Sequence, residues 1–390
     1  MSHTETLGVV GGGQLGRMLA AAAAPLGVEV IVLDPTPECP ASPVARDQLV
    51  GEFDDEDAIR ELAARADHLT YEIELADPNV LAAAAREFDV PVHPDPETLR
   101  TIQDKLVQKR RLREAGVPVP EFRRVDDRED LAAAVEEFGG VMLKAREGGY
   151  DGRGNVPVES EGEIDDALAR IEGGAMAERF VDFEREVSVI GVKGDGETAT
   201  FPVGENVHRE EILRETVVPP RTGEAVAERA REVAEDVLEL LSGRGVYGIE
   251  LFETSEAQGA SDTTDGEILV NEIAPRPHNS GHYTIEGAVT SQFEQHARAV
   301  TGRPLGATDL RGPVVMANLL GDVEARRPAE ISGVESVLSH PGASYHWYGK
   351  REVYPLRKMG HVTVVDPDGE ASAGELLGDA RDLRAEVTFK

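Results

Sequence analysis

The chain has 390 residues, 40% of them hydrophobic, which is too long for one hydrophobic core and favours two or three domains. Its formal net charge of −34 is spread along the sequence and excludes the basic patch that a nucleic-acid partner requires. No apolar run is as long as a transmembrane helix, and the single cysteine, Cys39, excludes an internal disulfide framework or a cysteine-based metal cluster.

Lysine is rare in this chain, with seven lysines among 40 basic residues. Many dispersed acids with few lysines indicate a surface adapted to high salt, where ions screen the self-repulsion, and so a halophilic source. The amino terminus has no basic segment ahead of an apolar one, so we expect no secretory signal and a cytoplasmic protein without membrane contact.

The first hundred residues alternate strand-like and helical segments. Strands are predicted at 7–10, 28–34 and 66–73, and a helix at 14–27. This alternation predicts a parallel sheet in a doubly wound α/β domain. Three prolines between residues 91 and 96 precede a charged helix at 104–116, which places a domain boundary near residue 100.

A glycine-rich turn follows the first strand. Gly11, Gly13 and Gly16 have the dinucleotide-binding spacing, and Asp34 closes the next strand. Backbone N–H groups at such a helix start attract anions, so the turn fits a dinucleotide, another phosphate or a purely structural tight turn. A dinucleotide-dependent oxidoreductase is disfavoured because the other half of the chain carries better-defined chemistry.

Shorter elements follow from residue 117 onward. A helix is expected near 131–138, strands at 141–145, 175–181 and 185–192, and a helix at 224–241. Two apolar strands around residues 250 and 272 are separated by a polar segment, 254–266, that we interpret as an exposed hairpin loop. The last eighty residues predict a small β-rich domain.

Two glutamates lie within these apolar strands, Glu250 in VYGIELFE and Glu272 in ILVNEI. A carboxylate on an apolar strand is costly to bury unless it is paired or bound to a metal. If the strands form a hairpin, both carboxylates face one cleft, while strict alternation turns Asn271 to the other face. Such oxygen ligands favour Mg²⁺ bridging a triphosphate. The alternative is two solvent-facing acids on a strand edge.

The segments around this pair supply groups that bind anions. Rigid APRPHNSGH carries Arg276, His278 and Asn279 directly after Glu272. Lys144 ends an apolar strand before the glycine loop 146–155, which predicts a phosphate clamp; the alternative is a snorkelling lysine and an ordinary turn. Glu178 and Glu186 are surface residues by default, although one of them could accept from a ribose hydroxyl.

Together these segments resemble the N5-carboxyaminoimidazole ribonucleotide synthases, an ATP-grasp family. GGGQLGRMLA, TYEIE, GGYDGRGN, ERFVDFEREVSVI, NEIAPRPHNSGH with TSQFEQH, and YGK with RKMGH match its blocks in order. The resemblance implies an N-terminal α/β domain at 1–100, an ATP-grasp domain at 101–310 with a lid lobe near 118–180, and a C-terminal β-rich domain at 311–390. It also implies ATP-dependent carboxylation of 5-aminoimidazole ribonucleotide by bicarbonate through carboxyphosphate, with Mg²⁺ as cofactor, in a homodimer.

Residue roles are carried over by matched motif. The resemblance assigns Mg²⁺ to Glu250 and Glu272, and catalysis to Arg276, His278, Asn279 and Lys350, the first three of them where bicarbonate and carboxyphosphate react. It assigns ATP to Lys105, Lys144, Gly149, Tyr150, Asp151, Gly152, Arg153, Gly154, Asn155, Glu178, Arg179, Phe180, Val181, Glu186, His208, Asn271 and Glu272. It assigns the ribonucleotide to Gln14, Glu74, Tyr150, Arg153, Lys350 and Arg357, with its phosphate at the glycine-rich turn and the C-terminal basic block.

The sequence departs from the family pattern at three places. Leu75 follows TYEIE where asparagine is expected, Leu356 replaces a usual glycine, and the segment 254–266 is longer than expected. These departures affect the expected contacts of the ribonucleotide and leave the Mg·ATP residues intact. The alternative within the same fold is a formate-dependent glycinamide ribonucleotide transformylase, which should lack the PHNSGH and RKMGH blocks. A regulatory nucleotide-binding protein without turnover is disfavoured because the expected catalytic residues are present.

Overall fold

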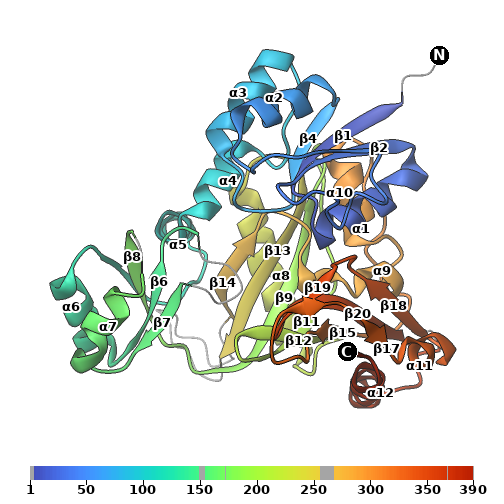
Figure 1. Ribbon diagram of the computed structural model, residues 1–390. Coiled ribbons are helices and arrows are strands. Elements are labelled where there is room, and N and C mark those ends of the chain that lie inside the picture. Colours follow the sequence, from blue (N-terminus) through green and yellow to red (C-terminus); the bar gives the residue numbers. More distant parts are fainter. Residues whose placement is uncertain (1–3, 149–153, 172, 255–267, 367, 390) are drawn as a thin grey trace.

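The computed structural model describes all residues except 1–3, 149–153, 172, 255–267, 367 and 390 (Figure 1). Within this part, the N-terminal domain contains a parallel four-stranded sheet in the order β3-β2-β1-β4. Its strands are β1 (Glu5–Val10), β2 (Val28–Leu33), β3 (Asp47–Leu49) and β4 (His68–Tyr71). The predicted parallel sheet is confirmed, and β3 is an additional short edge strand.

Helices cover both faces of this sheet. On one face, α1 (Gln14–Ala23) packs with α10 (Gln292–Val300), joining Leu15 and Leu19 to Phe293 and Ala297 in one core. On the other face lie α2 (Glu56–Ala64) and α3 (Pro78–Phe88). The helix predicted over 14–27 ends at Ala23 and continues as the 3₁₀ turn η1 (Ala24–Leu26), because Pro25 has no N–H for the helical ladder.

The helices α4 (Pro96–Gln103) and α5 (Lys105–Glu114) lead to a separate small lobe, seen at the left of Figure 1. Its sheet has the order β5-β8-β6-β7, with β5 (Phe122–Val125), β6 (Val141–Ala145), β7 (Asn155–Val158) and β8 (Ala175–Arg179). The helix α6 (Arg128–Phe138), the turn η2 (Glu161–Glu163) and the helix α7 (Ile164–Leu168) accompany these strands. This lobe has its own core, which includes Leu131, Leu143 and Ile164.

A long antiparallel sheet forms the centre of the molecule, in the order β14-β13-β9-β11-β12-β15-β20-β18, with β10 beside β9. Its first strands are β9 (Phe183–Lys193), β10 (Thr198–Thr200), β11 (Gly204–Arg209), β12 (Ile212–Val218), β13 (Gly245–Thr254) and β14 (Ile268–Ala274). The helix α8 (Glu224–Leu240) buries Val233, Val237 and Leu238 against them. It confirms the helix predicted at 224–241. The turn η3 (Asn279–Gly281) and the helix α9 (Thr284–Gly287) lead from β14 to α10.

The C-terminal strands extend the same sheet. β15 (Val314–Leu320) pairs with β12 on one side and with β20 (Lys358–Val365) on the other, and β18 (Ala343–Trp347) follows β20. The helices α11 (Val334–Ser339) and α12 (Ala373–Glu386) accompany them, as do the short strands β16 (Arg327–Pro328), β17 (Ile331–Ser332), β19 (Glu352–Val353) and β21 (Thr388–Phe389). Among the described residues, no helix has the length and apolar character needed to cross a membrane.

Candidate active site

The two glutamates lie directly opposite each other in the β13–β14 hairpin. Glu250 pairs with Glu272 in the antiparallel register, so their carboxylates project to the same side, which confirms the predicted hairpin. The register then shifts, because Leu251 pairs with Val270 and Asn271 is the extra residue of a β-bulge. The prediction that alternation separates Asn271 from Glu272 was therefore wrong: both line one small cavity with Lys105 and Lys144.

The two carboxyl groups have different environments. Burial, together with the nearby Glu272 and Glu186, raises the pKa of Glu250 to about 7. The Glu272 side chain is half exposed, and although the surrounding protein opposes its ionisation, Lys105, whose Nζ lies 2.6 Å from Glu272 Oε1, holds the pKa of that carboxyl below its ordinary value. Like charges directly opposite on paired strands repel, so this pair is suited to share a divalent cation.

Three of the seven lysines gather beside this pair. Lys109 Nζ lies 2.8 Å from Glu178 Oε2 and donates to Val270 O, while Lys144 Nζ lies 2.5 Å from Glu178 Oε1. Glu178 is buried, which corrects the default expectation of a surface residue. Although burial raises it, the two ammonium groups lower the pKa of Glu178 to about 2.

Lys109 was missed by the sequence analysis. It lies one helical turn after Lys105 on α5 and is almost fully buried, with a side chain 3% exposed. Burial lowers the pKa of Lys109 to about 8 even though Glu178 opposes the change. A signal was available, because lysine is rare in this chain and Lys109 lies three residues from both Leu106 and Leu112, which mark the buried side of α5.

The remaining predicted nucleotide residues lie partly inside and partly outside the described part of the chain. Glu186 Oε2 lies 3.0 Å from His208 Nδ1. Although burial lowers it, the carboxylates of Glu186 and Glu250 keep the pKa of His208 above its ordinary value. Arg179, Phe180 and Val181 continue from β8, with Arg179 paired to Glu121 at the surface. Gly149, Tyr150, Asp151, Gly152 and Arg153 lie outside the described residues, as does all of 254–266 except Thr254. Gly154 and Asn155 are described, and Asn155 pairs with Lys144 in the β6–β7 register.

The loop after Glu272 connects the carboxylate pair to the N-terminal domain. Arg276 Nη2 lies 2.8 Å from Glu74 Oε1, and His278 Nε2 lies 3.8 Å from Glu250 Oε1. A Cβ at Gly248 would approach His278 Cβ within 2.4 Å, so only glycine at this strand position allows the loop to lie so close. Asn279 is 5% exposed, and its side-chain amide pairs with that of Asn318.

The expected ribonucleotide residues come from three parts of the chain. Lys350 Nζ donates to Gln14 Oε1 at 2.8 Å, which brings the C-terminal region against the start of α1. Glu74 lines a cleft of about 1040 Å³ that extends to Gly148 and Gly154 on the small lobe. Arg357 does not take part in the contact between Lys350 and Gln14. It lies over the Tyr354 ring and donates to Glu352 O. Leu356, which replaces a usual glycine, has φ 62°, the left-handed conformation in which glycine is favoured.

The glycine-rich turn is occupied by the protein's own carboxylates. Gly13 N donates to Glu72 Oε1 at 2.5 Å and Gly12 N donates to Asp34 Oδ2 at 3.0 Å. Both acids are buried. These amides are therefore already satisfied, which favours the structural interpretation of the turn over a dinucleotide held at the same N–H groups.

Three family models match the chain in order. Residues 4–103 match the ribonucleotide synthetase preATP-grasp domain, 110–293 the ATP-grasp domain and 314–374 the phosphoribosylaminoimidazole carboxylase C-terminal domain. These matches confirm the predicted mixed α/β class and the order of the three domains.

Relatives and solved structures agree with these models. N5-carboxyaminoimidazole ribonucleotide synthase of Brucella melitensis biotype 1 is 44% identical over 93% of this chain and 97% of that protein. The crystal structure of the synthetase from Thermotoga maritima has 42% identity and a TM-score of 0.86, covering 99% of each chain. The synthase of Aspergillus clavatus, in complex with ADP and 5-aminoimidazole ribonucleotide, has 34% identity and a TM-score of 0.87, covering 99% of this chain and 100% of the other.

Proposed function

The chain belongs to the N5-carboxyaminoimidazole ribonucleotide synthase family of ATP-grasp ligases, and from this premise we propose that it carboxylates 5-aminoimidazole ribonucleotide with bicarbonate, using ATP. The products are ADP, phosphate and N5-carboxyaminoimidazole ribonucleotide, in de novo purine biosynthesis. The complexes of relatives with ATP, and with ADP plus 5-aminoimidazole ribonucleotide, support both substrates. The observation that carries the proposal is the Glu250–Glu272 pair with the lysines beside it.

We assign Mg²⁺ to the carboxylate pair. Two directly opposed carboxyl groups, whose mutual repulsion a cation between them would relieve, fit a hard divalent cation, which would also neutralise charge on the triphosphate. Lys105 and Lys144 would contact phosphate oxygens, a role that their position in the same small cavity as Glu272 supports. Phosphoryl transfer requires mainly such positioning and charge neutralisation.

The reaction proceeds through carboxyphosphate, which forms from bicarbonate and then supplies CO₂ to the amine. A bicarbonate oxygen attacks the γ-phosphorus of ATP and ADP leaves, which gives carboxyphosphate. Carboxyphosphate releases CO₂ and phosphate, and the exocyclic amine attacks the CO₂ carbon and loses a proton. Arg276 and His278 lie beside Glu74 and Glu250, where they bind the anionic reactant, and Lys350 with Gln14 closes the ribonucleotide side.

The other nucleotide contacts follow from the family match. We propose the backbone of Glu178 to Val181 as the adenine hinge, because the Glu178 side chain is already paired with lysines. We propose that Glu186, which lies 3.0 Å from His208 Nδ1, accepts a hydrogen bond from the ribose. The lid assigned to 149–155 would exclude water from carboxyphosphate when it closes.

Replacing one carboxylate tests the metal assignment. Glu272→Gln should reduce ATP turnover by about a hundredfold or more, because a metal ligand supplies several kcal/mol of charge stabilisation in the transition state. The Mg²⁺ concentration for half-maximal ADP release should also rise. Glu239→Gln, at an exposed position of α8, is the matched control. Normal turnover with unchanged Mg²⁺ dependence in Glu272→Gln would refute the assignment.

The substrate assignment is tested by substrate-dependent ADP release in high potassium chloride. We expect stimulation by 5-aminoimidazole ribonucleotide only when bicarbonate is present. Stimulation by formate with glycinamide ribonucleotide, without bicarbonate dependence, would establish the transformylase alternative instead. The matched C-terminal domain at 314–374 and the names of the relatives disfavour that alternative.

We further propose a homodimer in the cytoplasm of a salt-adapted cell. The family resemblance supports the dimer, and the net charge of −34 supports adaptation to salt. Light scattering of the purified chain in potassium chloride tests the dimer, since a monomer mass at micromolar concentration contradicts it.

A further inference from the structure

Asn279, in the loop that follows the carboxylate pair, is held by a second asparagine from the C-terminal part of the chain. Asn279 Nδ2 donates to Asn318 Oδ1 at 3.1 Å, and Asn318 Nδ2 donates back to Asn279 Oδ1 at 2.7 Å. Asn318 lies on β15 and is fully buried. This reciprocal pair uses one donor and one acceptor of each amide, so the two side chains fix each other's orientation.

Asn318 is itself held by further contacts. Its Nδ2 also donates to Leu213 O at 3.0 Å, and Tyr348 Oη donates to Asn318 Oδ1 at 3.5 Å. Tyr348 Oη also lies 2.9 Å from His361 Nδ1, and both of these side chains are fully buried. Both hydrogens of the Asn318 amide are thus donated inside the protein, which leaves it one stable orientation.

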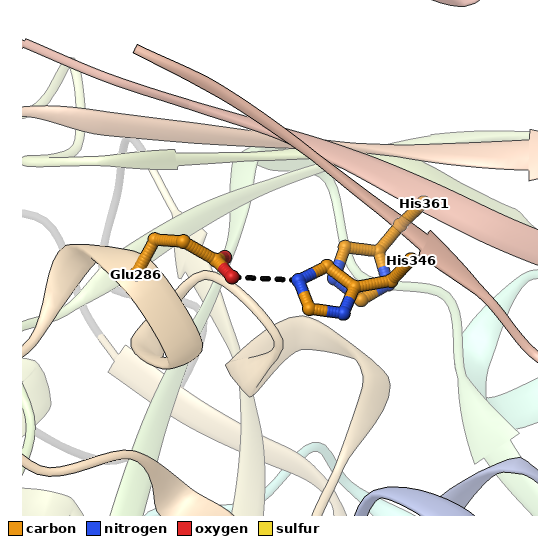
Figure 2. A group of neighbouring side chains, drawn as sticks. All are labelled: Glu286, His346 and His361. Atoms are coloured by element: carbon orange, nitrogen blue, oxygen red, sulfur yellow. Dashed lines mark hydrogen bonds and ion pairs between the residues drawn. The ribbon is translucent and has the colours of Figure 1, made fainter. Parts of the chain in front are cut away.

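The far end of this network is a pair of stacked imidazoles (Figure 2). His361 stacks on His346 with centroids 4.4 Å apart and planes 16° apart, and His346 Nε2 lies 2.6 Å from Glu286 Oε1. Glu286, His346 and His361 offer ligand atoms within 4.8 Å of one another. A cation must lie in the plane of each imidazole that binds it, and two stacked, nearly parallel rings have no such common point. The cluster therefore fits an anchor of the network better than a metal site.

We infer that Asn318 is a positioning residue for the carboxylation step, acting through Asn279 on the loop that carries Arg276 and His278. This inference rests on the proposed function of that loop. Arg276 of this loop is paired with Glu74, and His278 lies beside Glu250. A shift of the loop backbone would therefore move both Arg276 and His278. A misplacement of about 1 Å can cost about a hundredfold in rate. The C-terminal strand thereby contributes to catalysis without touching a substrate.

The expected signature is a loss of coupling between ATP use and carboxylation. In Asn318→Ala, the Asn279 amide remains buried without its partner, and the loop loses its fixed position. Carboxylation should fall about tenfold to a hundredfold, while KM for ATP changes less than twofold, because the metal and lysine residues are untouched. The number of ADP molecules released for each ribonucleotide carboxylated should rise above that of the parent.

Three further variants make the test specific. Asn279→Ala combined with Asn318→Ala should be no slower than Asn279→Ala alone within twofold, because one residue acts through the other. Tyr348→Phe removes only a hydroxyl and should show a weaker rise in the same ratio. Gln295→Ala is the matched control, since Gln295 is a fully buried amide on α10 that exchanges two hydrogen bonds with Gly306. It should lower the melting temperature and leave the ratio at the parental value.

The outcomes separate this inference from the proposed function. If the parent releases no ADP in response to 5-aminoimidazole ribonucleotide and bicarbonate, the proposed function fails. If the parent is active and Asn318→Ala keeps the parental ratio, or the two alanine substitutions multiply in effect, the positioning role of Asn318 is refuted. A raised ratio in Gln295→Ala as well would also refute it, because the effect would then follow general destabilisation.

Discussion

At the scale of single residues, the buried Glu178 holds two lysine side chains at the candidate ATP site. Glu178 contacts both Lys109 and Lys144, so these three side chains together have one positive charge in excess. A bound triphosphate can attract Lys144 while Lys109 remains as the counter-ion of Glu178. Lys109 therefore allows Lys144 to be shared between the protein and the nucleotide.

Replacing Lys109 tests this division of labour. In Lys109→Met, Glu178 keeps Lys144 as its only cation, so ATP must compete for that lysine and we expect KM for ATP to rise about tenfold. Stability should fall by about 3–5 kcal/mol, the usual cost of removing one member of a buried ion pair. Arg111→Met, an exposed change on the same helix, is the control. An unaltered KM for ATP in Lys109→Met would contradict the role.

At the scale of secondary-structure elements, the start of α1 lies against a buried carboxyl group of the protein itself. The Glu72 carboxyl accepts from Gly13 N and lies near Gly16, at the positive end of the helix dipole. Burial nevertheless dominates and raises the pKa of Glu72 to about 7. The folded protein therefore binds a proton at this site more tightly than the unfolded chain does.

This shift predicts how stability depends on pH. Because the folded pKa lies above the ordinary value of 4.5, Glu72 contributes stability that is complete below about pH 4.5 and is lost as the pH rises to about 7. The loss corresponds to about 3 kcal/mol at 1.36 kcal/mol per pKa unit. Glu72→Gln keeps the acceptor for Gly13 without ionising, so its free energy of unfolding relative to the parent should increase by about that amount between pH 4.5 and 8. Urea unfolding at a series of pH values measures this difference, with exposed Glu114→Gln as control. A constant difference between parent and Glu72→Gln would show that the carboxyl has no raised pKa.

The elements also show which features a sequence reveals. Continuous apolar runs located β1, β2 and the strands of the β13–β14 hairpin, and helical periodicity located α8, which buries one face. The bulge at Asn271 was not predictable, since β14 is apolar on both faces on either side of Asn271 and Glu272, and this hides the change of phase that an extra residue causes. Sequence placed Glu250, Glu272 and Lys144 in one site through their apolar flanks. It missed Lys109 and Asn318, whose roles depend on partners far away in the chain.

At the scale of the whole molecule, the candidate site lies where the three domains meet. The N-terminal domain supplies Gln14 and Glu74, the central sheet supplies the carboxylate pair, and the C-terminal region supplies Lys350. The C-terminal strands β15, β20 and β18 continue the central sheet, so they form a continuous layer with the strands that carry Glu250 and Glu272 (Figure 1). This explains how Asn318 reaches the loop after Glu272, a relation that the linear order of domains does not reveal.

The net charge of −34 acts on this assembly as a whole, and its effect should depend on salt. The Debye length falls from about 10 Å at 0.1 M to about 3 Å at 1 M, which removes most repulsion between exposed acids. Screening worth a few kcal/mol raises the melting temperature by about 5–10 °C, so we expect that increase between 0.1 and 2 M potassium chloride. Sucrose of equal osmolality controls for general solute effects.

A variant with fewer exposed acids distinguishes charge screening from other salt effects. Eight exposed acids are replaced by their amides: Asp54, Asp57, Glu114, Glu136, Asp166, Glu239, Glu324 and Asp379. Self-repulsion scales with the square of the net charge, so the rise in melting temperature with salt should shrink by about two-fifths. The variant should also melt at a higher temperature than the parent at 0.1 M salt, where repulsion is strongest. An identical salt dependence in both proteins would mean that the acidic surface does not control stability through its net charge.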